Sequence, residues 1–275
     1  MMNIKLILIL VILLTACAPI NNSISLEIKQ PPTKIFILAG QSNMVGRAGL
    51  IEDDFNYFNE NILVFGNDYQ LKIAYEPIDN GDGQIDIASY DKRPQFGPSM
   101  PFGIAMSTYL NQKVILVPCA LGGSSISQWE RPKNPLDTYT LYGSLVNRAL
   151  IAKQMSNGII AGVIWFQGEK DAVSYLDTHS NYLNLFIKFA TNIRIDLRDS
   201  QMPFIYAQLG PQDNNELFTY WDDIKAQQEQ AQYLISNSKM IKTDDLTIFD
   251  YVHFTHRSYE LIGQRFAEAF IKVDI

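Results

Sequence analysis

Short, almost uninterrupted runs of apolar residues recur along the chain, and stretches with helical periodicity separate them. Four of the runs are rich in β-branched and aromatic residues: 34–39 (KIFILA), 113–118 (KVILVP), 159–166 (IIAGVIWF) and 203–208 (PFIYAQ). Strands that are apolar at nearly every position are typical of parallel sheets, which are covered on both faces. We therefore predict four buried strands at these positions.

Helical patterns fill the segments between the strands, at 99–111, 142–156, 175–198 and 221–235. A last helix is predicted near the C-terminus, where Tyr259, Ile262, Phe266 and Phe270 fall on one helical face. Strands that alternate with single helices indicate an α/β fold with right-handed crossovers. Such sheets carry their sites at the carboxyl ends of the strands. No second-domain linker is visible, and we expect the Gly-, Asp- and Asn-rich insertion at 66–96 to line one side of the site.

The first residues have the pattern of a secretion signal. Lys5 precedes the apolar run 6–14, which is too short to cross a bilayer, since a spanning helix needs roughly 20 apolar residues. The run ends in Leu14-Thr15-Ala16-Cys17, which resembles a bacterial lipobox and implies cleavage before Cys17 and attachment of lipid to its thiol. An ordinary secreted protein cut at another bond is the alternative.

The predicted organisation is therefore a lipoprotein signal peptide at 1–16, a tether containing Pro, Asn and Ser at 17–33, and one domain at 34–275. We expect a protein of the cell envelope that a lipid anchors to a bacterial membrane, either periplasmic or surface-exposed. If Cys17 carries lipid, Cys119 has no disulfide partner.

Composition narrows the function classes. The 275 residues are 47% hydrophobic and 19% charged, which excludes an intrinsically disordered chain. The net charge is −7 and no basic stripe is present, so nucleic acid is a poor candidate partner. Two cysteines exclude a disulfide scaffold or a Cys-rich zinc site, and three histidines limit the choice of a catalytic base.

Two candidate segments follow the first two predicted strands. Gly40-Gln41-Ser42-Asn43-Met44 places Ser42 where a nucleophile gains from backbone N–H groups, although a helix N-cap is the alternative. The segment departs from the G-x-S-x-G elbow. After the second strand, Gly122 and Gly123 let the backbone approach a ligand, and Cys119 is interpreted as a small buried hydrophobe.

Two further segments carry polar groups suited to catalysis. Trp165-Phe166-Gln167-Gly168-Glu169 offers an amide that could donate to an oxyanion and a carboxylate that could orient a histidine. In Asp250-Tyr251-Val252-His253, a carboxylate can bond one imidazole nitrogen and leave the other for a serine. The other histidines, His179 and His256, are expected at solvated positions.

These four segments together resemble the SGNH-type carbohydrate esterases, and in particular the sialate O-acetylesterase domain group that includes acetylxylan esterases of carbohydrate esterase family 6. The resemblance extends from about residue 34 to residue 272. It implies a three-layer α/β/α sandwich with a mainly parallel, flavodoxin-like sheet. It also implies a serine esterase that removes O-acetyl groups from an acetylated glycan or sialic acid, without a metal or organic cofactor.

The resemblance assigns roles by position in this sequence. Ser42 would be the nucleophile, His253 the general base and acid, and Asp250 the residue that orients His253. Glu169 is a competitor for the role of Asp250. The oxyanion hole would combine the N–H of Ser42, the N–H of Gly123 or Gly122, and the side chain of Gln167.

Other interpretations are less well supported, and the non-catalytic and lipase or thioesterase functions are kept only as alternatives. The acidic stretch 79–86 suggests a calcium loop, but Ile78 stands where the EF-hand pattern requires its first Asp. A non-catalytic lipoprotein that binds glycan, or a lipase or thioesterase of related fold, would use the same pocket. Trp129 and Trp221 suit sugar stacking better than an acyl channel.

Overall fold

The sheet is built around the first predicted strand. The computed structural model describes residues 31–90 and 94–274. Along the chain its strands are β1 (Lys34–Gly40), β2 (Ile62–Phe65), β3 (Leu71–Ile73), β4 (Val114–Pro118), β5 (Ile159–Phe166), β6 (Phe204–Ala207) and β7 (Ser238–Ile241). They form one seven-stranded sheet in the order β3-β2-β4-β1-β5-β6-β7. Neighbours are parallel except for the antiparallel pair of β2 and β3.

The five strands β4-β1-β5-β6-β7 have the flavodoxin-like order, and the β2–β3 hairpin extends the sheet beyond β4. The order reverses at β1, because the chain places β4 on one side of it and β5 on the other. In open α/β sheets, ligands bind at such a switch point, outside the carboxyl ends of the strands. The topology therefore directs attention to the loops that follow β1 and β5.

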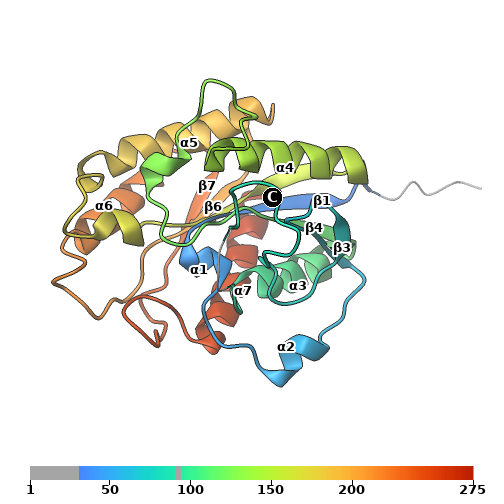
Figure 1. Cartoon of the computed structure of the whole chain (residues 1–275), viewed down its shortest axis with the longest axis horizontal. Coiled ribbons are helices and arrows are strands. Elements are labelled where there is room, and N and C mark those ends of the chain that lie inside the picture. The colour runs from blue at the N-terminus through green and yellow to red at the C-terminus, as the bar shows by residue number, and fades with distance from the viewer. Residues whose placement is uncertain (1–30, 91–93, 275) are drawn as a thin grey trace, which may run out of the picture. The chain divides into compact units, whose positions relative to one another are not determined.

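Helices cover both faces of the sheet (Figure 1). They are α1 (Ser42–Val45), α2 (Glu52–Asn56), α3 (Ser99–Leu110), α4 (Leu141–Ser156), α5 (Tyr182–Asp196), α6 (Trp221–Ala231) and α7 (His256–Asp274), with 3₁₀ turns at Ile126–Trp129, Glu169–Ala172 and His179–Asn181. One core packs α4, α5 and α6 on the sheet, and the other packs α1, α3 and α7. The predicted three-layer α/β/α sandwich is confirmed.

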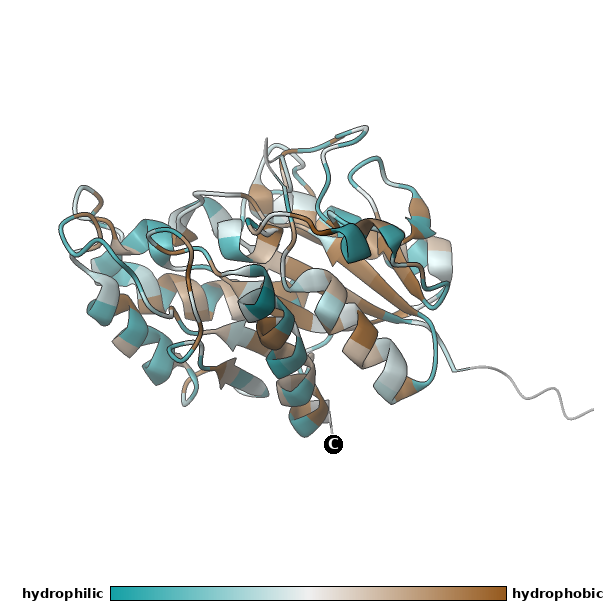
Figure 2. Ribbon diagram, turned by 90° about the horizontal axis from the view of Figure 1, so that it is seen from below, coloured by the Kyte–Doolittle hydropathy of each residue, from teal (hydrophilic) through white to brown (hydrophobic). Residues whose placement is uncertain are grey.

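The strands are apolar at nearly every position because each face meets a helix layer. In β1, Ile35 and Ile37 lie in the core beneath α4 and α5, whereas Phe36 and Leu38 lie in the core beneath α3 and α7. All four side chains are at most 1% exposed. Figure 2 shows the result, with hydrophobic residues concentrated on the strands and hydrophilic residues on the outer helix surfaces.

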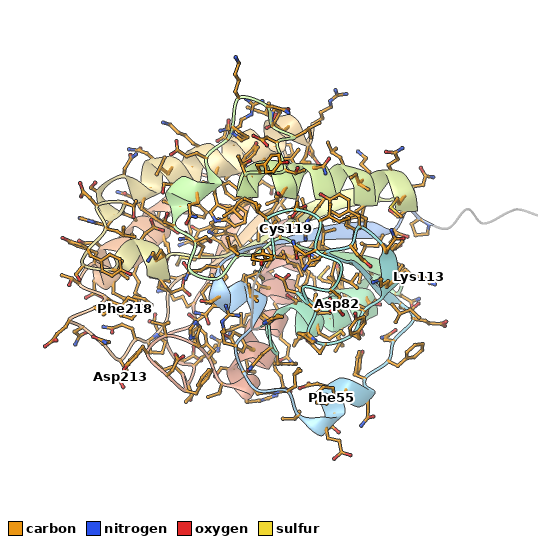
Figure 3. The ribbon with its side chains drawn as sticks, viewed as in Figure 1. Phe55, Asp82, Lys113, Cys119, Asp213 and Phe218 are labelled. Atoms are coloured by element: carbon orange, nitrogen blue, oxygen red, sulfur yellow. The ribbon has the colours of Figure 1, made fainter. Side chains whose placement is uncertain are left out.

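The C-terminal helix confirms its predicted face. Tyr259, Ile262, Phe266 and Phe270 are at most 2% exposed and pack in the core beside α3. Cys119 is completely buried, as predicted, and Figure 3 shows it near the middle of the sheet. Within the described ranges, no helix is both long and apolar enough to cross a membrane.

The prediction missed the short elements. The strands β2, β3 and β7 have three or four residues each, and α1 and α2 have four and five, so periodicity has too little length to show in them. The predicted helix at 175–198 begins only at Tyr182. The chain before it bonds elsewhere: the Ser174 N–H donates to the Leu217 carbonyl. The helix predicted at 221–235 ends at Ala231.

Candidate active site

Ser42 occupies the turn between the central strand and α1. At the end of β1, Gly40 has φ +137°, and a Cβ there would lie 2.0 Å from the Phe166 carbonyl oxygen, so only glycine lets the end of β1 approach β5 this closely. The next N–H, of Gln41, donates to that carbonyl at 2.8 Å. Ser42 then begins α1, where first-turn N–H groups lack intrahelical acceptors.

Three predicted residues come together at this point. His253 Nε2 lies 2.9 Å from Ser42 Oγ, and His253 Nδ1 lies 2.7 Å from Asp250 Oδ2. With the proton on Nδ1, the ring donates to Asp250 and can accept the hydroxyl proton of Ser42. The arrangement has the connectivity of a Ser–His–Asp triad.

Asp250 holds both the ring and the backbone of the loop before α7. Its Oδ1 accepts the N–H groups of Val252 at 2.9 Å and His253 at 2.7 Å. Partial burial alone would raise the pKa of Asp250, but these N–H groups and the His253 ring outweigh it and lower the pKa. The carboxylate therefore stays ionised beside the imidazole.

Asn43 ties this loop to α1 and was not identified from the sequence. Its Nδ2 donates to Glu169 Oε1 and, at 3.0 Å, to the Val252 carbonyl, while its Oδ1 accepts the Tyr259 hydroxyl at 2.6 Å. The Val252 carbonyl adjoins His253, so Asn43 determines where the imidazole lies relative to Ser42. The available signal was its position directly after Ser42 in the motif.

Glu169 lies in the site but bonds Asn43, and no bond to the imidazole of His253 is found. Its side chain is 2% exposed, and burial raises its pKa to about 7. One carboxylate oxygen, Oε2, has no hydrogen-bond partner among residues 31–90 and 94–274. Of the two competing carboxylates, Asp250 is thus the one beside His253.

A pocket of about 320 Å³ opens in front of Ser42. It is lined by Gln41, Ser42, Arg47, Gly123, Glu169, Lys170, Val173, Tyr175, Leu217, Phe218, Val252 and His253. Gly123 has φ +73°, a left-handed conformation that favours glycine, and of the two candidate glycines it is the one that lines the pocket.

The described parts of the insertion, 66–90 and 94–96, do not line this pocket, whereas 91–93 lie outside the described residues. A buried ion pair between the insertion and α4 explains why the insertion packs elsewhere. The Arg148 side chain of α4 is fully buried and pairs with Asp86 at 2.7 Å. It also donates at 2.7 Å to the Pro118 carbonyl, which anchors the insertion to the end of β4.

The structure does not place Gln167 where an oxyanion donor is needed. Its side chain is completely buried, and its Nε2 donates to Asp171 Oδ2 at 2.5 Å and to the Ser124 carbonyl at 3.1 Å. The same nitrogen lies 3.3 Å from Oε1 of Gln41, which lines the pocket. The position of Gln167 after β5 predicted an oxyanion donor, but its amide bonds the buried Asp171 and Gln167 does not line the pocket.

The tryptophans expected to stack on sugar are core residues. Trp129 is completely buried, and its indole N–H donates to Ser124 Oγ at 3.1 Å. Trp221 is 6% exposed and donates to the Gly210 carbonyl at 2.9 Å. The aromatic wall is formed instead by Tyr175 and Phe218. Phe218 lies on the loop before α6 (Figure 3).

The remaining histidines are only partly solvated. His179 stacks on Tyr220 with ring centroids 3.5 Å apart. His256 stacks on Phe96 at 3.7 Å, and its Nε2 lies 3.0 Å from Asp54 Oδ2. Both side chains are 19% exposed, so the predicted solvation is only partial. At His256, Asp54 of α2 and Phe96 at the end of the insertion cover part of the ring. In the described residues, no group of three His, Cys, Asp or Glu side chains is placed to hold a metal ion.

Comparisons with known proteins extend these observations. The family model described as "carbohydrate esterase, sialic acid-specific acetylesterase" matches residues 32–272. A protein of Arabidopsis thaliana named "probable carbohydrate esterase" is 31% identical over 258 residues, which cover 88% of this chain and 91% of the plant protein.

Solved structures show the same fold. The X-ray structure of an Arabidopsis thaliana protein has a TM-score of 0.74 and 29% identity, and the match covers 88% of this chain and 99% of that one. The structure of a carbohydrate acetylesterase from Xanthomonas citri has a TM-score of 0.63 and 18% identity, with 87% of this chain and 56% of that one covered.

Proposed function

The chain belongs to the sialic acid-specific acetylesterase family of carbohydrate esterases, and from this premise we propose that it removes O-acetyl groups from carbohydrate with Ser42, His253 and Asp250. The observation that carries the proposal is the continuous hydrogen-bonded chain from Asp250 Oδ2 through His253 to Ser42 Oγ. This row of hydrogen bonds ends at Ser42, in a pocket at the switch point of the sheet.

The reaction proceeds in two acyl-transfer steps. Ser42 Oγ attacks the acetyl carbonyl carbon while His253 Nε2 takes the hydroxyl proton. The tetrahedral oxyanion accepts hydrogen bonds from the backbone N–H groups of Ser42 and Gly123. When it collapses, the ester C–O bond breaks, and His253 returns the proton to the departing sugar hydroxyl.

Water then completes the cycle. His253 takes a proton from water, which attacks the acetyl-Ser42 ester, and collapse of the second tetrahedral intermediate releases acetate and restores the Ser42 hydroxyl. Asp250 stabilises the imidazolium in both steps and keeps Nε2 directed at Ser42. No other reactant than the acetyl ester and water is required.

Side chains around the pocket bear on the choice of sugar. Leu217, Phe218 and Tyr175 offer apolar surface for a ring face, and Lys170 brings positive charge to the pocket. Lys170 Nζ donates to the Tyr175 hydroxyl at 3.0 Å, which orients both side chains. This combination supports an acetylated sugar that carries a carboxylate, such as sialic acid, over a neutral one.

Acetate release tests the proposal. The protein is assayed on O-acetylated sialic acid, acetylated xylan, acetylated peptidoglycan and an aryl acetate, with the Ser42→Ala variant as control. We expect release from the aryl acetate and from at least one carbohydrate, and none above background with the variant. Activity that survives Ser42→Ala would overturn the mechanism, and the absence of release from every carbohydrate would overturn the function.

We also propose that lipid on Cys17 anchors the protein to a bacterial membrane. Support comes from the lipobox-like sequence and the tether behind it, which lie outside the described residues except for positions 31–33. Cells that express the protein are labelled with a tagged fatty acid. Wild type should be labelled and Cys17→Ala should not, and equal labelling of both would exclude the anchor.

A further inference from the structure

A second cavity, of about 580 Å³, lies beside α2, α3 and the first turn of α7. In Figure 1 these three helices are on the same side of the sheet. None of the residues that line this cavity lines the pocket in front of Ser42. Its volume is within the range of small-molecule sites, roughly 300–1,000 Å³.

Glu76 is a buried polar side chain of this cavity, and only one of its two carboxyl oxygens has a partner among the described residues. It is 7% exposed, and its Oε2 accepts the Ile78 N–H at 3.0 Å. The other oxygen, Oε1, is buried and has no hydrogen-bond partner in the part of the chain that the structure describes. A buried polar atom without a partner is costly, so a ligand that donates to Oε1 is favoured.

The neighbouring charges identify the donor as a cation. His256 Nε2 lies 3.0 Å from Asp54, and Arg257 pairs with Glu260 at 2.5 Å. These two basic groups are thus already matched to carboxylates, and none of the ion pairs found in the described residues includes Glu76. Burial, together with the nearby charge of Asp54, raises the pKa of Glu76 to about 8, and the Ile78 N–H offsets only part of this rise. A cation bound beside Glu76 would favour the ionised carboxylate.

Part of the cavity wall is apolar and aromatic. Met100, Ile104 and Tyr109 line it from α3, and Tyr57 lines it from the segment after α2. This wall suits an organic body of a few carbon atoms, while a bare metal ion would lack oxygen ligands: no three carboxylate or imidazole groups of the described residues are grouped for one.

We propose that this cavity binds a small organic amine, whose ammonium group donates to Glu76 Oε1 while its apolar or aromatic body packs against α3. The binding requires no chemical step and is separate from the esterase reaction. A hydrogen bond to a charged group contributes about 1.5–3 kcal/mol, so charge should change affinity by about ten- to hundredfold.

Benzylamine and benzyl alcohol are matched probes, because they share a ring and differ in the charged group. Each is titrated into the folded protein and followed by calorimetry and by the NMR signals of the His256 ring. We expect benzylamine to bind at least about tenfold more tightly than benzyl alcohol and to shift the His256 signals. Ser42→Ala should bind both probes as wild type does, so the result is independent of esterase activity.

Two variants assign the binding to Glu76. Glu76→Gln keeps the shape of the side chain without the charge, and should lower the affinity for benzylamine by at least about tenfold. Asp53→Asn is the control, because Asp53 also lines the cavity but is exposed. It should change the affinity for benzylamine less than threefold, which corresponds to about 0.7 kcal/mol of binding free energy. Circular dichroism confirms that both variants are folded; should Glu76→Gln fail to fold, Ile104→Trp, which fills the apolar end, replaces it. Equal binding of alcohol and amine, no binding of benzylamine, or undiminished binding by the variants at Glu76 or Ile104 would overturn the proposal.

Discussion

His253 and His256 are one helical turn apart in the sequence, and each bonds a carboxylate, yet their surroundings differ. His253 has Asp250 on Nδ1 and the Ser42 hydroxyl on Nε2. His256 has Asp54 on Nε2, at 3.0 Å, and Glu260 3.7 Å from Nδ1. A general base needs one nitrogen beside the proton that it removes, and His256 meets a carboxylate on each side. A histidine–aspartate pair is therefore insufficient to mark a catalytic site.

The two histidines differ in the residue that the fold brings to each of them from a distant part of the sequence. His253 belongs to a loop that meets the carboxyl end of β1, where Ser42 lies. His256 belongs to the first turn of α7, and Phe96 covers one face of its ring. Each cluster also has a buried carboxyl, Glu169 beside the first and Glu76 beside the second, with one oxygen that bonds none of the described residues. The two clusters thus have similar groups, but only the first contains a nucleophile.

The largest expected difference between the clusters concerns their aspartates. Asp250→Asn should lower kcat on an aryl acetate by about 10⁴-fold, because the amide cannot hold the productive imidazole tautomer or stabilise its charged form. Asp54→Asn should leave kcat within about threefold, because Asp54 bonds His256 and not the triad. A change of that size corresponds to less than 1 kcal/mol in the activation free energy. Steady-state kinetics of both purified variants provides the comparison.

Glu169→Gln is the control for this ranking. It keeps an oxygen that can accept the Asn43 amide, so its kcat should fall by far less than that of Asp250→Asn. The opposite ranking would transfer the orienting role from Asp250 to Glu169. A severe loss in Asp54→Asn would show that the two histidine clusters are coupled.

A smaller loss of kcat is expected from substitution of Gln167, which is buried beside the first cluster and bonds Asp171 and the Ser124 carbonyl. Gln167→Ala would leave Asp171 Oδ2 and the Ser124 carbonyl without this donor, and a buried group left without its partner costs about 1–3 kcal/mol. The free energy of unfolding, measured with urea, should fall by that amount. On the aryl acetate, kcat should fall by less than the 10²–10³-fold that follows loss of an oxyanion donor. A loss of kcat of that size with unchanged stability would restore Gln167 as the donor.

The last two predictions concern the pH dependence of stability that the two buried carboxyls cause. Burial raises the pKa of Glu169 to about 7 and that of Glu76 to about 8, above an unfolded value near 4.3. Between the unfolded and folded values the native state binds more protons, so each carboxyl lowers stability as pH rises through that window. Glutamine removes this loss. Relative to wild type, Glu169→Gln should gain stability from about pH 4 to 7, and Glu76→Gln from about pH 4 to 8.

Urea unfolding at several pH values measures both windows. The gain of Glu169→Gln should level off about one pH unit before that of Glu76→Gln, in proportion to the two raised pKa values. A pH-independent difference from wild type for either variant would mean that the corresponding carboxyl is ionised throughout, with a partner or water that offsets its burial.

Local pattern was sufficient for the class of fold and for the family. Short apolar runs rich in β-branched and aromatic residues favour buried strands, and β1 and β5 formed where predicted. The motif around Ser42 and the Asp250–His253 spacing led to a family resemblance that the family match confirms. The spacing also anticipated the Asp250–His253 bond, because residues close in the chain can meet within one turn.

Contacts between distant segments were decided only by the tertiary structure. The hydrogen bond between Ser42 and His253 joins residues that are 211 positions apart in the sequence. The local sequence around each residue would be the same whether or not the two side chains meet in the fold. Burial beside Asp171 turned Gln167 away from the pocket, and the fully buried pair of Arg148 and Asp86 carried the insertion to β4. Sequence patterns report which residues seek burial, whereas the partner that each buried polar group finds depends on how the layers pack.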